Sequence, residues 1–88
     1  MPFELDSAWR LDRQVAIRPE PFGALAYHFG TRRLSFLKTR KLVDVVCALE
    51  AQPSALDACQ AAGVSEEELP SYRVALDRLA GSGMVVLR

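Results

Sequence analysis

Few side chains in this sequence have the types and spacing that catalysis or metal binding requires. His28 is the only histidine, and neither Cys47 nor Cys59 belongs to a C-x-x-C pair, so we expect two buried free thiols. We expect the acidic triplet at residues 66–68 to lie in a first helical turn, where the helix dipole favours carboxylates. No G-x-S-x-G motif or phosphate-binding glycine pattern occurs. We therefore predict that the chain is not an enzyme and holds no metal or cofactor.

Charge is distributed unevenly along the 88 residues, although the net charge is zero. Residues 1–44 carry eight bases and five acids, and residues 45–88 carry three bases and six acids. The bases are densest at residues 32–41. This surplus is compatible with an acidic partner and equally with an ordinary solvated face.

The composition is that of one globular domain, with half of the residues hydrophobic and a quarter charged. No apolar run approaches the roughly 20 residues of a membrane span, and the beginning, MPFELDSAWR, lacks the pattern of a signal peptide. We expect a cytoplasmic protein without a membrane partner. Its expected parts are an N-terminal arm at residues 1–10, anchored by Phe3, Leu5 and Trp9, and a single domain at residues 11–88.

Alternating apolar residues predict a three-stranded antiparallel meander at the beginning of this domain. The strands are expected at residues 11–18, 24–29 and 32–37, and the prolines at 19 and 21 end the first of them.

A two-residue type II′ turn, Gly30-Thr31, fits between the second and third strands. It pairs Phe29 with Arg32 and fixes the rest of the register. We expect the large side chains Leu25, Tyr27, Leu34 and Phe36 to share the buried face, and Ala24, Ala26, His28, Arg33 and Ser35 to share the other.

Three helices are expected in the second half. Thr39 can cap the first, which continues to about residue 50, and a short second helix covers residues 55–62. Ser65 and Glu68 form a capping box for the third, although Pro70 predicts a kink or a restart. A short strand at residues 84–87 follows. The fold class is therefore α+β, a winged helix-turn-helix of three helices preceded by a three-stranded antiparallel sheet, with a short C-terminal strand.

Two binding functions remain open for this fold. A winged-helix DNA-binding regulator is one alternative, but the third helix begins with three carboxylates and carries only Arg73 and Arg78 as bases. The other is strand addition by a peptide, because residues 32–38 form an edge strand without proline or glycine. Main-chain hydrogen bonds contribute about 1 kcal/mol each, so micromolar binding also requires an apolar groove, which Tyr72, Leu76 and Leu79 can line.

The segment RPEPFGALAYHFGTRRLSFLK at residues 18–38, with AGVSEEELPSY and LAGSGMVVLR, resembles the mycofactocin biosynthesis peptide chaperones, within the PqqD-like group of RiPP recognition elements. The resemblance implies a PqqD-like fold and a non-catalytic protein that binds the leader of a ribosomally made precursor peptide. It also implies delivery of that peptide to a radical S-adenosylmethionine (SAM) maturase, which supplies the iron–sulfur clusters and SAM.

In that group, the leader adds antiparallel to the third strand and packs beside the third helix. The resemblance therefore implies peptide-binding roles for Arg33, Leu34, Ser35, Phe36 and Leu37, with Tyr72, Arg73 and Leu76 opposite. An open edge strand and an N-terminal arm also favour a homodimer or a domain swap.

Overall fold

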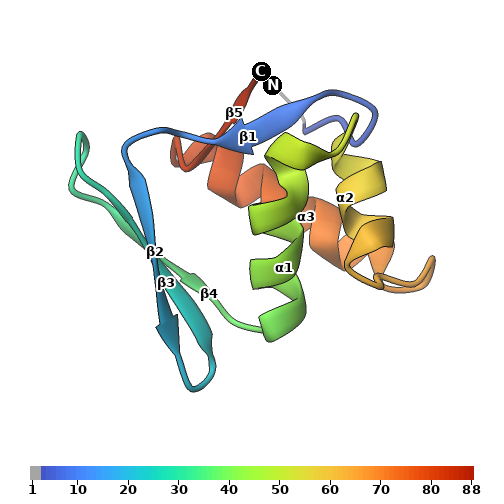
Figure 1. Cartoon of the computed structure of the whole chain (residues 1–88), viewed down its shortest axis with the longest axis horizontal. Helices are drawn as coiled ribbons and strands as arrows, with labels where there is room; N and C mark the ends of the chain where they lie inside the picture. The colour runs from blue at the N-terminus through green and yellow to red at the C-terminus, as the bar shows by residue number, and fades with distance from the viewer. Residues whose placement is uncertain (1–2) are drawn as a thin grey trace.

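The computed structural model describes residues 3–88, which form a three-stranded sheet beside three α-helices, with a two-stranded ribbon across one end (Figure 1). The predicted α+β class is confirmed, whereas the winged-helix and PqqD-like assignments stay predictions. In chain order the elements are β1 (Trp9–Leu11), β2 (Val15–Glu20), β3 (Gly23–His28), β4 (Leu34–Leu37), α1 (Arg40–Ala48), the 3-10 helix η1 (Leu49–Ala51), α2 (Ala55–Ala61), α3 (Leu69–Gly81) and β5 (Val85–Leu87).

The single strand predicted at residues 11–18 is wrong, because this part of the chain forms two strands, β1 and β2. The Asp12 carboxylate accepts a hydrogen bond from the Gln14 N–H (2.8 Å), and the Asp12 carbonyl accepts one from the Val15 N–H (3.0 Å). This turn separates β1 from β2, because Asp side chains stabilise such local turns. β1 then pairs antiparallel with β5, in the register Trp9↔Leu87. The C-terminal strand consequently covers β1 and leaves β4 as an edge of the order β2-β3-β4.

Two of the three expected anchors near the N-terminus, Phe3 and Trp9, are buried in the core. Their rings stack with centroids 4.2 Å apart, and the Phe3 N–H donates to the Asp77 carboxylate of α3 (2.9 Å). The Trp9 indole N–H donates to the Glu4 carbonyl (2.8 Å). Leu5 is only partly buried and packs against the same core. Residues 1–2 of the expected arm lie outside the described residues.

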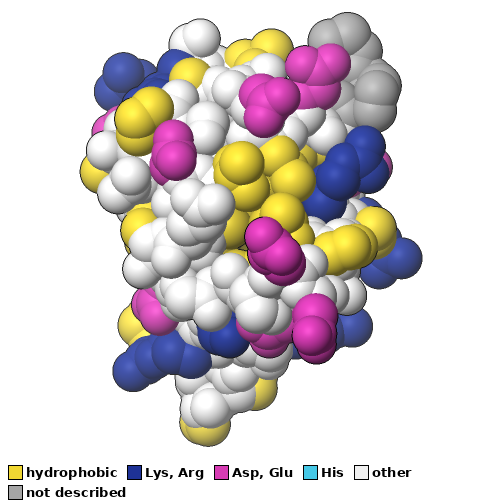
Figure 2. Space-filling model, turned by 90° about the vertical axis from the view of Figure 1, so that its right-hand side faces the viewer, with side chains coloured by type: hydrophobic (Ala, Val, Ile, Leu, Met, Phe, Trp, Pro, Cys, Tyr) yellow, Lys and Arg dark blue, Asp and Glu magenta, His cyan; other side chains and the backbone are white. Residues whose placement is uncertain are grey.

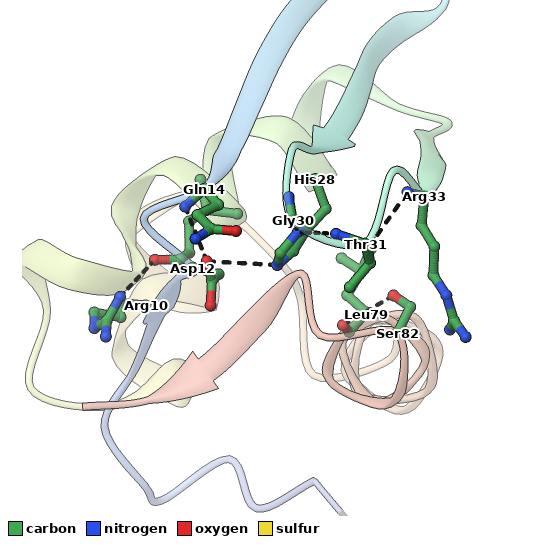
Figure 3. A network of polar contacts seen from close by, with 10 residues as sticks. Arg10, Asp12, Gln14, His28, Gly30, Thr31, Arg33, Leu79 and Ser82 are labelled. Carbon is green, nitrogen blue, oxygen red and sulfur yellow. Dashed lines mark hydrogen bonds and ion pairs between the residues drawn. The ribbon is translucent and has the colours of Figure 1, made fainter.

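The β3–β4 connection differs from the predicted two-residue turn. Residues 29–33 connect the two strands, and the positive φ belongs to Arg32 (62°) instead of Gly30. The His28 imidazole Nδ1 accepts the N–H groups of Gly30 (3.0 Å) and Thr31 (3.1 Å), and its Nε2 lies 3.5 Å from the Asp12 carboxylate (Figure 3). The buried His28 side chain therefore accepts the backbone N–H groups of the loop. This contact stabilises a longer loop than the two-residue turn that Gly30-Thr31 favours.

The predicted β3–β4 register is confirmed, but the predicted buried face is wrong. Tyr27 pairs with Leu34 and Leu25 pairs with Phe36, as expected. The side chains of Leu34 and Phe36 are nevertheless 58% and 62% exposed. The face that packs against α1 consists instead of the opposite parity, whose buried members are Ala24, Ala26, His28 and Leu37.

The helices begin and end close to the predicted residues. The Thr39 hydroxyl accepts the Leu42 N–H (3.1 Å) and caps α1, and Gly63 (φ +88°) follows α2. The reciprocal Ser65–Glu68 capping box is present, and α3 begins at Leu69, so Pro70 lies in its first turn. This agrees with the predicted restart. The expected inner face of the first helix is buried: Leu42, Val45, Val46 and Leu49.

The two cysteines have different environments. Cys59 is a buried free thiol, as expected, and burial raises its pKa. Cys47 is exposed, so the expectation of a second buried thiol is wrong. It follows Val46 on α1, and one residue of helix rotates it about 100° away from the core-facing side.

Candidate functional site

The outer edge of β4 presents backbone hydrogen-bonding groups that no strand within residues 3–88 uses. The His28 N–H donates to the Arg33 carbonyl (3.0 Å), so this pair is a hydrogen-bonded one. Hydrogen-bonded and non-hydrogen-bonded pairs alternate along an antiparallel ladder. The backbone groups of Ser35 therefore face β3, and those of Leu34 and Phe36 face outward. This edge can accept a further extended strand.

A groove of about 440 Å³ lies between β4 and α3. Its volume falls within the range of small ligand sites. The β4 strand contributes Ser35 and Phe36, the beginning of α1 contributes Leu42, and one face of α3 contributes the opposite wall. The lining residues are Ser35, Phe36, Lys38, Thr39, Leu42, Ser71, Tyr72, Ala75, Arg78, Leu79 and Ser82.

One end of the groove is bounded by Tyr72 and Thr39, whose side-chain oxygens lie 3.4 Å apart. Toward the last turn of α3, the Ser82 hydroxyl donates to the Leu79 carbonyl (3.1 Å), a bond drawn in Figure 3. The Ser82 O–H group therefore satisfies a carbonyl near the end of the helix, and Ser82 also lines the groove.

The charges that line the groove have one sign. Lys38 and Arg78 line it, no Asp or Glu does, and neither cation forms an ion pair within residues 3–88. Lys41, three residues beyond Lys38, is instead paired with Glu68 at 2.9 Å. The hydrogen bond to Glu68 raises the pKa of Lys41, and the same bond lowers the pKa of Glu68. This ion pair joins the first turn of α1 to the beginning of α3.

The structure brings three of the eight predicted site residues into the groove lining: Ser35, Phe36 and Tyr72. Leu34 is exposed on β4, and Arg33 and Arg73 are exposed outside the lining. Leu37 and Leu76 are fully buried, so their side chains belong to the core. Leu79, which was expected to line a groove, does so.

Sequence reasoning missed most of the α3 wall because Pro70 left the orientation of that helix undecided. With α3 beginning at Leu69, residues spaced by three or four positions share one face. That spacing selects Ser71, Ala75, Arg78 and Ser82, all of which line the groove. Lys38, Thr39 and Leu42 were also missed as lining residues, since they belong to the β4–α1 junction and no periodic pattern marks them.

The outer face of the three-stranded sheet exposes several large apolar side chains. Phe22 and Phe36 have ring centroids 6.0 Å apart, and Tyr27 and Phe29 meet edge to face at 5.1 Å. Phe22, Phe29, Leu34 and Phe36 are between 46% and 62% exposed. Such a cluster is larger than scattered exposed apolar residues and is typical of an interaction surface.

Within the described part of the chain, no three His, Cys, Asp or Glu side chains lie close enough together to hold a metal ion. None of the helices there has the length and apolar character that crossing a membrane requires.

The comparisons with known proteins agree with one another. The profile of the "Peptide chaperone MftB family" matches residues 8–86. The peptide chaperone MftB of Mycobacterium ulcerans (strain Agy99) is 57% identical over 84 residues, which cover 96% of this chain and 77% of that protein. The proteins of the same name from Mycobacterium tuberculosis and Mycolicibacterium smegmatis are each 55% identical, over 98% and 96% of this chain and 79% and 82% of their own lengths. No solved structure matches significantly.

Proposed function

The chain belongs to the peptide chaperone MftB family, and on this premise we propose that it binds the leader of the mycofactocin precursor peptide by strand addition. It then presents the peptide to a radical SAM maturase. The relatives are named peptide chaperones, and this name supports a peptide as the binding partner. The proposed role is non-catalytic, and the iron–sulfur clusters and SAM belong to the maturase.

The observation that supports this proposal is the unpaired edge of β4 beside the groove. An added strand can exchange hydrogen bonds with the N–H and C=O groups of Leu34 and Phe36. These four bonds contribute about 1 kcal/mol each at best, whereas micromolar affinity requires about 8 kcal/mol. Two apolar side chains buried in the groove, at about 1.5–3 kcal/mol each, would supply the remaining free energy of binding.

The implied site residues take different roles under this proposal. Leu34 and Phe36 pair through their backbones, while Ser35 and Tyr72 contact the peptide through their side chains. Leu37 and Leu76 act from the core by fixing β4 and α3 on either side of the groove. The exposed guanidinium groups of Arg33 and Arg73 lie outside the groove lining, so the proposal assigns them the smallest contributions to binding.

The experiment that tests strand addition is calorimetric titration of the leader peptide into the wild type and two variants of Leu34. Leu34→Pro removes an N–H that faces the open edge, and Leu34→Ala keeps that N–H while removing the side chain. We expect Leu34→Pro to weaken binding at least tenfold and Leu34→Ala to weaken it much less. Circular dichroism establishes that both variants are folded. Unchanged affinity in folded Leu34→Pro would show that strand addition is wrong.

A proline at Ser35 is a poorer test of the same idea. The Ser35 backbone faces β3, so Ser35→Pro would damage the existing sheet before it affected an added strand. The matched pair at Leu34 avoids this ambiguity.

Homodimer formation is a competing use of the same edge, since a second copy could pair through its own β4. Sedimentation of the free protein and of the peptide complex distinguishes the two uses. We propose that the peptide takes this edge, and we expect a monomer in the complex.

DNA binding, which the helix-turn-helix outline left open, is not proposed. Figure 2 views the side of the molecule formed by α2 and the beginning of α3, where several acidic side chains, together with Lys or Arg side chains at one edge, lie around the hydrophobic area at its centre. Carboxylates repel phosphates, on which affinity for DNA chiefly depends. Salt-sensitive binding of duplex DNA that requires Arg73 and Arg78 would restore this alternative.

A further inference from the structure

We propose that the groove selects one short pattern in the peptide: an apolar residue opposite Ser35, with a carboxylate two residues away on each side. This inference rests on the proposed function and names the chemistry of the segment that binds. It follows from three properties of the groove, namely the direction in which β4 side chains point, the apolar floor and the placement of the two cations.

The direction is fixed by the strand geometry. Leu37 is fully buried and Ser35 lines the groove, so both point toward the helical side of the sheet. In a ladder, residues directly opposite one another point to the same face. The peptide residue opposite Ser35 therefore points into the groove. Its neighbours two positions away point to the same side and lie about 7 Å from it in each direction.

Apolar side chains line much of the groove, namely Leu42, Ala75 and Leu79. Ala75 lies between Tyr72 and Arg78 on α3 and is small enough to leave space beside the larger side chains. A carboxylate or amide placed there would lose its hydration without a charged partner, whereas an aliphatic or aromatic side chain gains from burial.

The two cations lie toward opposite ends. Lys38 is adjacent to Thr39, whose hydroxyl lies near that of Tyr72. Arg78 is six residues farther along α3 than Tyr72, which corresponds to about 9 Å of helix rise. Carboxylates separated by four residues of extended peptide are about 13 Å apart, and the long Lys and Arg side chains reach over the remaining distance. The pattern is the same in both chain directions, so it does not depend on the orientation of the peptide.

An acidic peptide also fits this edge better than a second copy of the chain. Antiparallel pairing of two β4 strands would bring Arg33 and Lys38 of both copies to one short ladder. Four cations would then lie close together, and the groove lining contains no acidic side chain to neutralise them. Like charges opposite one another destabilise a ladder, so charge complementarity favours the acidic peptide.

The test uses the leader peptide with the wild type, Lys38→Gln, Arg78→Gln and the double variant, and Arg13→Gln is the control. Arg13 is an exposed cation that lies outside the groove. We expect each groove variant to bind the leader about 3- to 10-fold more weakly and the double variant to lose more, while Arg13→Gln stays within twofold of the wild type. The wild type should also lose affinity between about 50 and 300 mM salt, with a smaller loss in the double variant.

A scan of the leader, in which each Asp or Glu is changed singly to Asn or Gln, then locates the partners. We expect two positions, four residues apart and flanking an apolar residue, at which the effect of Lys38→Gln or Arg78→Gln disappears. If the wild type binds the leader but the double variant binds equally well, the charge pattern is wrong and the proposed function stands. If the wild type does not bind the leader, the proposed function and this inference fail together.

Discussion

The phenolic oxygen of Tyr72 lies 3.4 Å from the hydroxyl oxygen of Thr39, so the residue that caps α1 also bounds one end of the groove. Helix capping and groove shape therefore depend on the same side chain. A change at Thr39 is expected to alter both the free energy of unfolding and the affinity for a bound peptide, and these two effects can be measured separately.

Thr39→Ala removes the oxygen that accepts the Leu42 N–H, so we expect the free energy of unfolding to fall by about 1 kcal/mol. Thr39→Ser keeps the hydroxyl and should retain most of that stability. Tyr72→Phe loses only the contact with Thr39 and should be close to the wild type in urea unfolding. A Thr39→Ala variant as stable as the wild type would mean that this cap contributes nothing measurable.

Gly23→Ala is expected to destabilise the protein by about 2–4 kcal/mol. A Cβ atom at this position would lie 2.1 Å from the Leu37 carbonyl oxygen and 3.2 Å from the Thr39 nitrogen, and both are backbone atoms that cannot move aside cheaply. Gly81→Ala is the matched control, because nothing lies within 4 Å of its Cβ position and the residue is helical. It should be neutral or stabilising by up to about 1 kcal/mol. Thermal unfolding of the two variants checks this contrast.

On this sheet, changing a large exposed side chain should cost less stability than enlarging a small buried one. Phe36→Thr alters a side chain that is 62% exposed, so we expect a loss of less than about 1 kcal/mol. Ala26→Leu inserts volume at a residue that is 1% exposed, in the layer beneath α1, and should cost about 1–3 kcal/mol. A larger loss for Phe36→Thr than for Ala26→Leu in urea unfolding would restore the predicted buried face.

The Lys41–Glu68 ion pair should make a small contribution to stability that depends on pH. The pKa of Glu68 is lowered below 4.5, so its contribution is present above that value and is lost as the pH falls through the lowered pKa. The pKa of Lys41 is raised above 10.5, so its contribution is present below that value and is lost as the pH rises through the raised pKa. The stability difference between the wild type and Lys41→Met should therefore be greatest between these limits. A difference that is constant from low to high pH would show that the ion pair is not its source.

Local sequence signals predicted the helical half well because each helix end is determined by a few neighbouring residues. Thr39 and the Ser65–Glu68 pair form the predicted hydrogen bonds, and the β3–β4 register follows from simple alternation. The buried face of the sheet did not follow from alternation, since both parities contain apolar residues. The contact with α1 decides that face, and only small side chains such as Ala24 and Ala26 leave room for the helix.

The candidate site was predictable in outline but not in detail. Its strand edge follows from the absence of proline and glycine in residues 32–38, yet the α3 wall depends on where that helix begins. The β1–β5 pairing was also not predicted, because it joins residues more than 70 positions apart and has no local signature. The role of His28 in shaping the loop depends in the same way on Asp12, which belongs to a different turn.

The open edge of β4 has a thermodynamic consequence for the protein itself. A ligand that binds only the folded chain stabilises it by mass action, by about 2.7 kcal/mol at a free concentration one hundred times the dissociation constant. A peptide paired with this edge would lengthen the β2-β3-β4 sheet, which presents small side chains such as Ala24 and Ala26 to α1, and would thereby raise the unfolding temperature of the protein. Under the proposed function, the melting temperature would then report how much of the β4 edge is occupied, and the bound peptide would stabilise the protein that binds it.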